Sequence, residues 1–108
     1  MSQNIFFEIK DVSPAAKKEI FDLKKALEKK AGTPVFEEFA YKNGAITGWS
    51  TSLTAFNFKA YTQIYNNIIK FFRAISKEFK LAIKINDECR DKKYAIKSGS
   101  GGELMYES

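Results

Sequence analysis

The chain begins with an alternating segment that is typical of a β-strand. In residues 5–9 the apolar side chains fall on one side, except for Phe6, which shares the other side with a glutamate. Ser13 and Pro14 then predict a helix start, because serine can cap free backbone N–H groups and proline removes one that would lack a partner. Apolar residues recur at three- and four-residue spacing until Gly32, where we expect this first helix to end.

The next segment predicts a β-hairpin. Asn43 and Gly44 are a strong hairpin signal, because a type I′ turn needs positive φ at both central residues. Pairing Lys42 with Ala45 sets the register and thereby decides which side chains share a face. The first face carries Val35, Phe39, Tyr41 and Ile46, and the second carries Phe36, Glu38, Ala40, Thr47 and Trp49.

A long second helix follows, for which residues 50–52 supply N-cap candidates and which should run to about Lys77. Its first apolar stripe comprises Leu53, Phe56, Ala60, Ile64, Ile68, Phe71 and Ile75, and its second comprises Phe58, Tyr61, Tyr65, Ile69 and Phe72. The two stripes span about 220°, whereas one core-facing stripe needs roughly 100°. We therefore expect the second stripe to be a subunit interface; contact with the first helix, with tyrosine hydroxyls reaching water, is the simpler alternative.

The remaining pattern completes an α+β fold. Residues 81–85 alternate as a fourth strand, residues 87–91 read as a polar turn, and residues 94–97 predict a short extra strand. The order β-α-β-β-α-β predicts a ferredoxin-like arrangement, with both helices on one face of an antiparallel sheet whose centre holds the first and third strands. We expect one domain over residues 1–97 and a flexible Gly/Ser-rich tail over residues 98–108.

The sheet face without helices is a candidate binding surface. It should carry Phe6 and Trp49 on adjacent central strands, with Phe36 nearby. Exposed apolar patches mark protein contacts, and this is the use we expect. The alternative is a single-stranded nucleic-acid site, most naturally for RNA, in which aromatic side chains stack on bases and cations hold phosphates. Its residues would be Phe6, Trp49, Lys84, Lys97, Lys59, Lys70, Arg73 and Lys77.

The composition bears on the choice between a protein-binding and a nucleic-acid-binding surface, and on catalysis and metal binding. The 108 residues include 18 Lys+Arg and 13 Asp+Glu, which gives a net charge of +5, yet only Arg73 and Arg90 are arginines. Because arginine makes the bidentate contacts of specific nucleic-acid recognition, a lysine-rich surface is weak support for it. The absence of histidine excludes His-dependent catalysis, and the single Cys89 excludes an intramolecular disulfide and a thiolate zinc site. We therefore expect no cofactor, no metal site and no catalytic residue.

These observations predict a small, basic, non-enzymatic protein-interaction module. We expect it to be cytoplasmic, because the sequence shows neither a signal peptide nor a membrane-length apolar run and has a lone cysteine. An adaptor, an inhibitor or immunity-type protein, or a regulatory subunit of a bacterial or phage system would fit, with self-association as a homodimer. The predicted partner-binding residues are Phe58, Tyr61, Tyr65, Ile69, Phe72, Phe6, Phe36 and Trp49.

Overall fold

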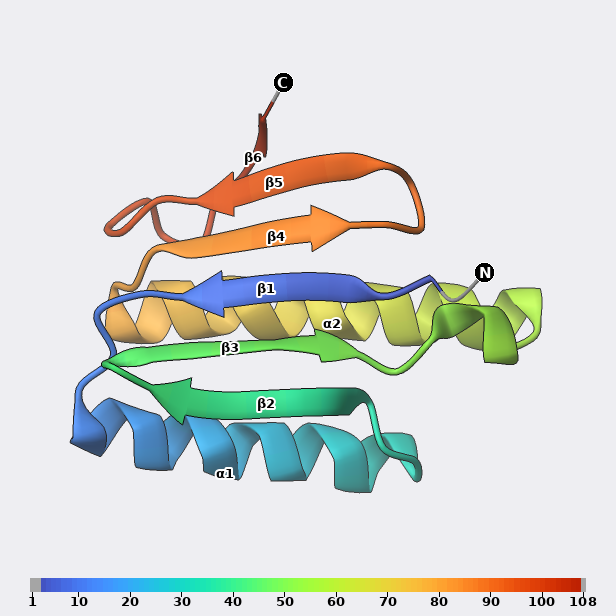
Figure 1. Ribbon diagram of the computed structural model, residues 1–108, viewed down its shortest axis with the longest axis horizontal. Coiled ribbons are helices and arrows are strands. Elements are labelled where there is room, and N and C mark those ends of the chain that lie inside the picture. The colour runs from blue at the N-terminus through green and yellow to red at the C-terminus, as the bar shows by residue number, and fades with distance from the viewer. Residues whose placement is uncertain (1–2, 108) are drawn as a thin grey trace.

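The strands of the protein form one six-stranded antiparallel sheet, and two helices pack against it (Figure 1). The computed structural model describes residues 3–107. The elements are β1 (Ile5–Ile9), α1 (Pro14–Ala31), β2 (Phe36–Lys42), β3 (Ala45–Ser50), the 3-10 turn η1 (Leu53–Ala55), α2 (Phe58–Phe79), β4 (Ile83–Asp87), β5 (Lys92–Ile96) and β6 (Leu104–Glu107). The strand order is β2-β3-β1-β4-β5-β6. The predicted α+β class is confirmed, and the sheet is wider than predicted.

Both helices cover the same face of the sheet. The ring of Phe39 on β2 lies 5.1 Å from that of Phe21 on α1 and 6.2 Å from that of Phe71 on α2, measured between centroids. The fully buried core includes Ile5, Ile9, Ile20, Ile46, Ile68, Phe72, Ile75 and Ile83. The opposite side of the sheet faces the viewer in Figure 1. We call it the open face; it carries Phe6, Glu8, Thr47, Trp49, Lys84, Asn86, Lys93 and Met105.

The β2–β3 hairpin has the predicted register. Lys42 pairs with Ala45 across the turn, and the pairing continues in step as far as Glu38. Asn43 and Gly44 have φ values of 53° and 76°, as a type I′ turn requires. The turn chemistry therefore fixes which side chains of this hairpin reach the core.

A β-bulge at the start of β2 changes the side on which Phe36 lies. Phe36 pairs with Ser50 while Glu38 pairs with Trp49, so Glu37 is an extra residue on β2. Phe36 consequently points into the core and is only 6% exposed. The predicted placement of Phe36 on the open face is wrong, because strict alternation does not hold across a bulge.

The second helix begins later than predicted. Asn57 caps α2, since its side-chain oxygen accepts a hydrogen bond from the N–H of Ala60 at 2.9 Å. Ser50 is instead the last residue of β3, where its hydroxyl accepts a hydrogen bond from the Ile5 N–H at 2.9 Å. Residues 53–55 form the 3-10 turn between strand and helix. The predicted N-cap at residues 50–52 is therefore wrong.

The segment expected to be a flexible tail contains a further strand. β6 pairs with β5, with Tyr106 opposite Tyr94. The loop before β6 contacts α2, because the Arg73 Nε–H donates a hydrogen bond to the Gly102 carbonyl oxygen at 2.8 Å. Gly102 also approaches the helix so closely that a Cβ atom there would lie 2.5 Å from the Arg73 carbonyl oxygen. The glycines of this segment therefore permit a close backbone contact that positions β6.

Candidate functional site

An aromatic pair lies near the centre of the open face. Phe6 and Trp49 are directly opposite each other on β1 and β3, with ring centroids 5.8 Å apart and an interplanar angle of 40°. The indole N–H of Trp49 donates a hydrogen bond to a carboxylate oxygen of Glu37 at 3.2 Å. Both rings are half-buried. The predicted proximity of the two rings is thus confirmed, and the bulged Glu37 orients the tryptophan.

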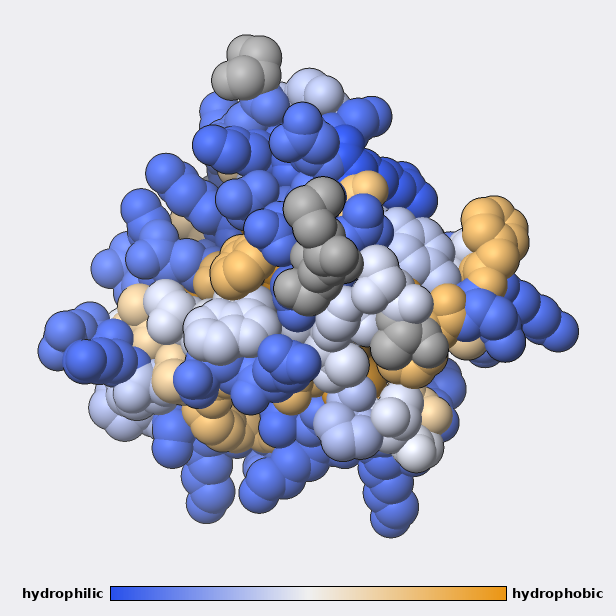
Figure 2. Space-filling model, turned by 45° about the vertical axis from the view of Figure 1, so that its right-hand side comes forward, coloured by the Kyte–Doolittle hydropathy of each residue, from blue (hydrophilic) through white to orange (hydrophobic). Residues whose placement is uncertain are grey.

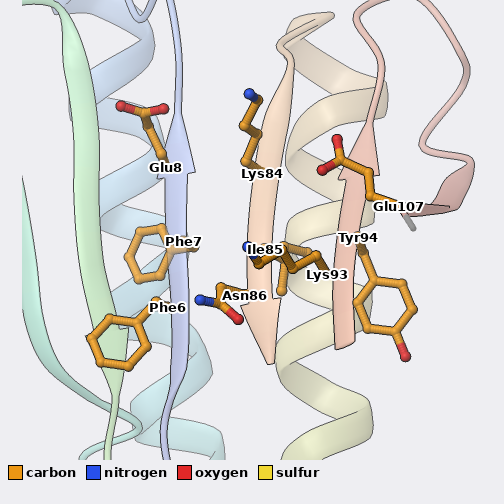
Figure 3. A pocket seen from close by; sticks show the side chains of 9 residues that line it. All are labelled: Phe6, Phe7, Glu8, Lys84, Ile85, Asn86, Lys93, Tyr94 and Glu107. Atoms are coloured by element: carbon orange, nitrogen blue, oxygen red, sulfur yellow. The ribbon is translucent and has the colours of Figure 1, made fainter. Parts of the chain in front are cut away.

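A shallow hollow lies beside Phe6, above β1, β4 and β5 (Figure 3). Its rim consists of polar and charged groups: Glu8 on β1, Lys84 and Asn86 on β4, Lys93 on β5 and Glu107 on β6. Apolar side chains on the side of the molecule shown in Figure 2 form separate spots among hydrophilic ones. A partner of the open face must therefore satisfy charges as well as cover aromatic surface.

The charges of the open face are mixed in sign. Carboxylates lie at Glu8 on β1, Glu38 on β2 and Glu107 on β6, and lysines lie at Lys42 on β2, Lys84 on β4 and Lys93 on β5. The one ion pair in which Glu8 takes part among residues 3–107 joins it to Lys10 at 3.9 Å, and each of the two side chains is a little less than half exposed. The face is consequently not a continuous basic track of the kind that follows a polynucleotide backbone.

The residues of the nucleic-acid alternative do not form one site. Phe6, Trp49 and Lys84 lie on the open face, whereas four of the cations belong to α2, in the helix layer on the other side of the sheet. Those four are Lys59, Lys70, Arg73 and Lys77. Lys97 follows the end of β5. Stacking on the open face and phosphate contacts on α2 would therefore need different ligands.

The second stripe of α2 is largely part of the core. Tyr65 is 4% exposed and Phe72 is fully buried, so their predicted placement on a subunit interface is wrong. Tyr61 and Ile69 are half-buried and pack against the core, and Phe58 is 85% exposed. Tyr65 and Phe72 are buried because the sheet is wider than predicted. Side chains of β5 and β6, namely Tyr94, Ile96 and Leu104, supply the additional surface that covers the helix.

A buried polar cluster that the sequence pattern did not predict surrounds Asp87. One carboxylate oxygen accepts a hydrogen bond from the Tyr65 hydroxyl at 2.6 Å, and the other accepts the N–H groups of Cys89 and Arg90 at 2.8 and 3.2 Å. Asp87 has no exposed surface and is the last residue of β4, two residues beyond the predicted strand end. Its position two residues after the buried Ile85 is the sequence signal that could have placed it on the core side.

The side chains around Asp87 pack against one another and thereby stabilise this part of the fold. The Arg90 guanidinium lies 4.2 Å from the centroid of the Tyr65 ring. The ring of Tyr61 stacks on the Tyr65 ring, with the two centroids 6.1 Å apart. Burial, reinforced by the nearby Asp87 charge, raises the pKa of the Cys89 thiol. A thiol held protonated is a poor nucleophile. The cluster therefore fixes the β4–β5 turn against α2.

The same cluster predicts a loss of stability at alkaline pH. Burial and the hydrogen bond to Asp87 raise the pKa of Tyr65 above its ordinary value of 10.0. The unfolded chain releases the phenol proton near pH 10 and the folded chain retains it, so this stabilisation is present below about pH 10 and is lost above it. Urea unfolding from about pH 8 to about pH 11 should show a smaller alkaline loss in Tyr65→Phe than in the wild type. The exposed Tyr106→Phe is the matched control, and equal losses in all three proteins would contradict the assignment.

Two further properties of the described residues concern membranes and metal ions. No helix within residues 3–107 is long and apolar enough to cross a membrane. In the same part of the chain, no three side chains of the His, Cys, Asp and Glu types are grouped as ligands of a metal ion.

Comparisons with models of protein families, with curated proteins and with solved structures found no match for this chain.

Proposed function

We propose that the protein is a protein-interaction module that acts by binding, and that the open face contacts a second copy of the same chain. The observation that supports this is the charge pattern across the middle of the sheet. Glu8 on β1 and Lys84 on β4 are opposite each other on the two central strands. Trp49 on β3 and Lys93 on β5 lie one strand further out, in one row of the sheet.

A two-fold axis that runs parallel to the strands, between β1 and β4, would use this pattern. Such an axis places each strand over its mirror position in the partner sheet, so that Glu8 of one copy faces Lys84 of the other and Trp49 faces Lys93. Every contact is then made twice, including the one like-charge contact in this row, between Glu38 on β2 and Glu107 on β6. Two twisted sheets pack face to face with nearly aligned strands about 10 Å apart, and a Lys–Trp contact adds a cation–π attraction.

The size of the sheet limits the strength of this contact. Six strands spaced about 4.8 Å apart and about five residues long cover roughly 29 Å by 17 Å, or of the order of 500 Å² per copy. Two such faces bury about 1,000 Å² in total, which is near the lower end for specific interfaces. We therefore expect a weak, reversible dimer whose aromatic centre is excluded from water.

Charge reversal tests the dimer. Lys84→Glu places like charges opposite each other in both symmetry-related pairs, and Glu8→Lys does the same, so each variant alone should be a monomer. An equimolar mixture of the two variants should dimerise again, because each protein then carries charges of a single sign at these positions. Sedimentation velocity at several concentrations measures the mass, and circular dichroism checks the fold.

The control is Lys25→Glu, which makes the same change of charge at an exposed position of α1 and should leave the dimer intact. Trp49 is the only tryptophan, so its emission should shift to longer wavelength when the wild type is diluted. A wild type that stays monomeric at high concentration, or a mixture that fails to associate, would remove the proposal. Quenching of Trp49 by oligo-dT that weakens steeply with added salt would instead favour the single-stranded nucleic-acid alternative.

We also propose that β1 to β4 and the two helices form a ferredoxin-like unit widened by β5 and β6. The order β2-β3-β1-β4, with β1 and β3 inside, supports this assignment. An adaptor, inhibitor or regulatory subunit would use such a unit as a rigid platform for the open face.

A further inference from the structure

A second hollow lies on the helix side of the molecule, between α2 and the loop that leads to β6. It is lined by Lys70, Arg73, Ala74, Lys77, Gly101 and Gly102. The three cations are spaced at i, i+3 and i+7 and therefore follow one side of the helix. This hollow is separate from the open face, and its proposed role does not depend on the dimer.

Arg73 is held in place by the loop. Its Nε–H donates a hydrogen bond to the Gly102 carbonyl oxygen at 2.8 Å, which restrains the guanidinium. Neither terminal nitrogen of Arg73 makes a hydrogen bond to another described residue. Because a guanidinium binds phosphate oxygens through two parallel N–H groups, a restrained arginine is well suited to an anion.

The loop contributes backbone N–H groups. Gly99, Gly101 and Gly102 have positive φ values of 79°, 73° and 82°, so the chain makes tight turns there. Within residues 3–107, the amides of Gly101 and Gly102 donate no hydrogen bond. Successive backbone N–H groups in such turns form concave anion-binding sites. The lack of a side chain on Gly102 lets the loop approach the α2 backbone, because a Cβ atom there would lie 2.5 Å from the Arg73 carbonyl oxygen.

The local charge balance is positive. None of Lys70, Arg73 and Lys77 forms an ion pair with a described carboxylate. The Ser98 hydroxyl donates a hydrogen bond to the Lys80 carbonyl oxygen at 2.7 Å, which brings the start of the loop to the end of α2. Lys80 and Lys97 add two cations at this end, and Glu78 and Glu103 are the two acids in the same segments.

We propose that this hollow binds a phosphate monoester group. Three cations and the two free amides match a compact dianion with three terminal oxygens. Arg73 would bind two oxygens, Lys70 and Lys77 would balance the second charge, and the glycine amides would bind the remaining oxygen.

A nuclear magnetic resonance titration with inorganic phosphate tests the site. The titration is run near pH 7.5, where phosphate is mostly dianionic, with chloride keeping the ionic strength constant. The amide signals of Gly101 and Gly102 and the Arg73 Nε–H signal should shift together and saturate. The signals of Gly32 and Gly44 in distant turns should not move. Shifts that are equal with chloride alone, or that spread over many lysines without saturating, would overturn the proposal.

Variants locate the binding groups. Arg73→Gln and Lys77→Gln should each weaken phosphate binding by about tenfold or more, since each removes a charged hydrogen-bond donor. Lys77 makes no hydrogen bond to the loop, so its variant separates lost binding from a displaced loop. Lys25→Gln on α1 removes the same charge elsewhere and should bind phosphate as the wild type does. An equal loss in the Lys25 variant, or tighter binding of oligo-dT than of phosphate at equal phosphorus concentration, would contradict a monoester site.

Discussion

Replacing Asp87 with alanine should lower the free energy of unfolding by about 3–5 kcal/mol. The substitution removes three hydrogen bonds at once, because the carboxylate accepts the Tyr65 hydroxyl and the N–H groups of Cys89 and Arg90. The tyrosine hydroxyl is buried and would lose its acceptor. A buried donor without an acceptor is more destabilising than the mean value of a hydrogen bond, since it also loses its contact with water.

A double-mutant cycle separates the parts of this effect. Tyr65→Phe removes one donor, and the double variant should lose less stability than the two single losses together, because both single variants break the same hydrogen bond. Urea unfolding followed by circular dichroism measures all four proteins at neutral pH. Asp22→Ala, at an exposed position of α1, is the control and should stay within about 0.5 kcal/mol of the wild type. A loss of less than about 1 kcal/mol in Asp87→Ala would show that the cluster is dispensable.

Gly48→Ala should lower the free energy of unfolding nearly as much as Asp87→Ala does. A Cβ atom on Gly48 would lie 1.9 Å from the Glu38 carbonyl oxygen and 2.6 Å from its carbonyl carbon, so β2 would have to move away from β3. Gly48 pairs with Phe7 on one side and with Phe39 on the other, and these two rings approach to 5.3 Å between centroids on the core side. A shift of the backbone would therefore also disturb the aromatic part of the core.

We expect Gly48→Ala to reduce stability by about 3 kcal/mol, which corresponds to a fall of the melting temperature of about 12 °C or more for a domain of this size. Thermal unfolding followed by circular dichroism gives the value. Thr47→Ala, on the neighbouring exposed residue, should change the melting temperature by only a few degrees. A melting temperature of Gly48→Ala close to that of Thr47→Ala would show that β2 and β3 can separate at little cost.

Local chemistry made the central part of the fold predictable. The Asn43–Gly44 turn set the hairpin register correctly because the turn type and the strand pairing determine each other. The bulge at Glu37 could not be predicted in this way, since two successive glutamates fit either side of a strand. The bulge is instead determined by the packing of Phe36. Its ring points into the core, where its centroid lies 5.5 Å from that of Phe7 and 6.1 Å from that of Phe72.

The last strand was not predicted because its composition is misleading. A run of Gly and Ser is typical of a flexible linker, and the following residues are few. The pairing of β6 depends on the free edge of β5 and on the contact between Gly102 and Arg73, which lie far apart in the sequence. The same wider sheet explains why Tyr65 and Phe72 are buried. An amphipathic pattern gives the width of an apolar face and leaves open what covers it.

The central position of β1 has a consequence for the folding rate. The hairpins β2–β3, β4–β5 and β5–β6 join strands that are neighbours in sequence, so each can form early with little loss of chain entropy. β1 pairs with β3 on one side and with β4 on the other, and Ile5 is paired with Asp87, which lies far from it in the sequence. The two halves of the sheet can therefore join only when β1 enters between them. This closure has a high contact order and should be the slow step of folding.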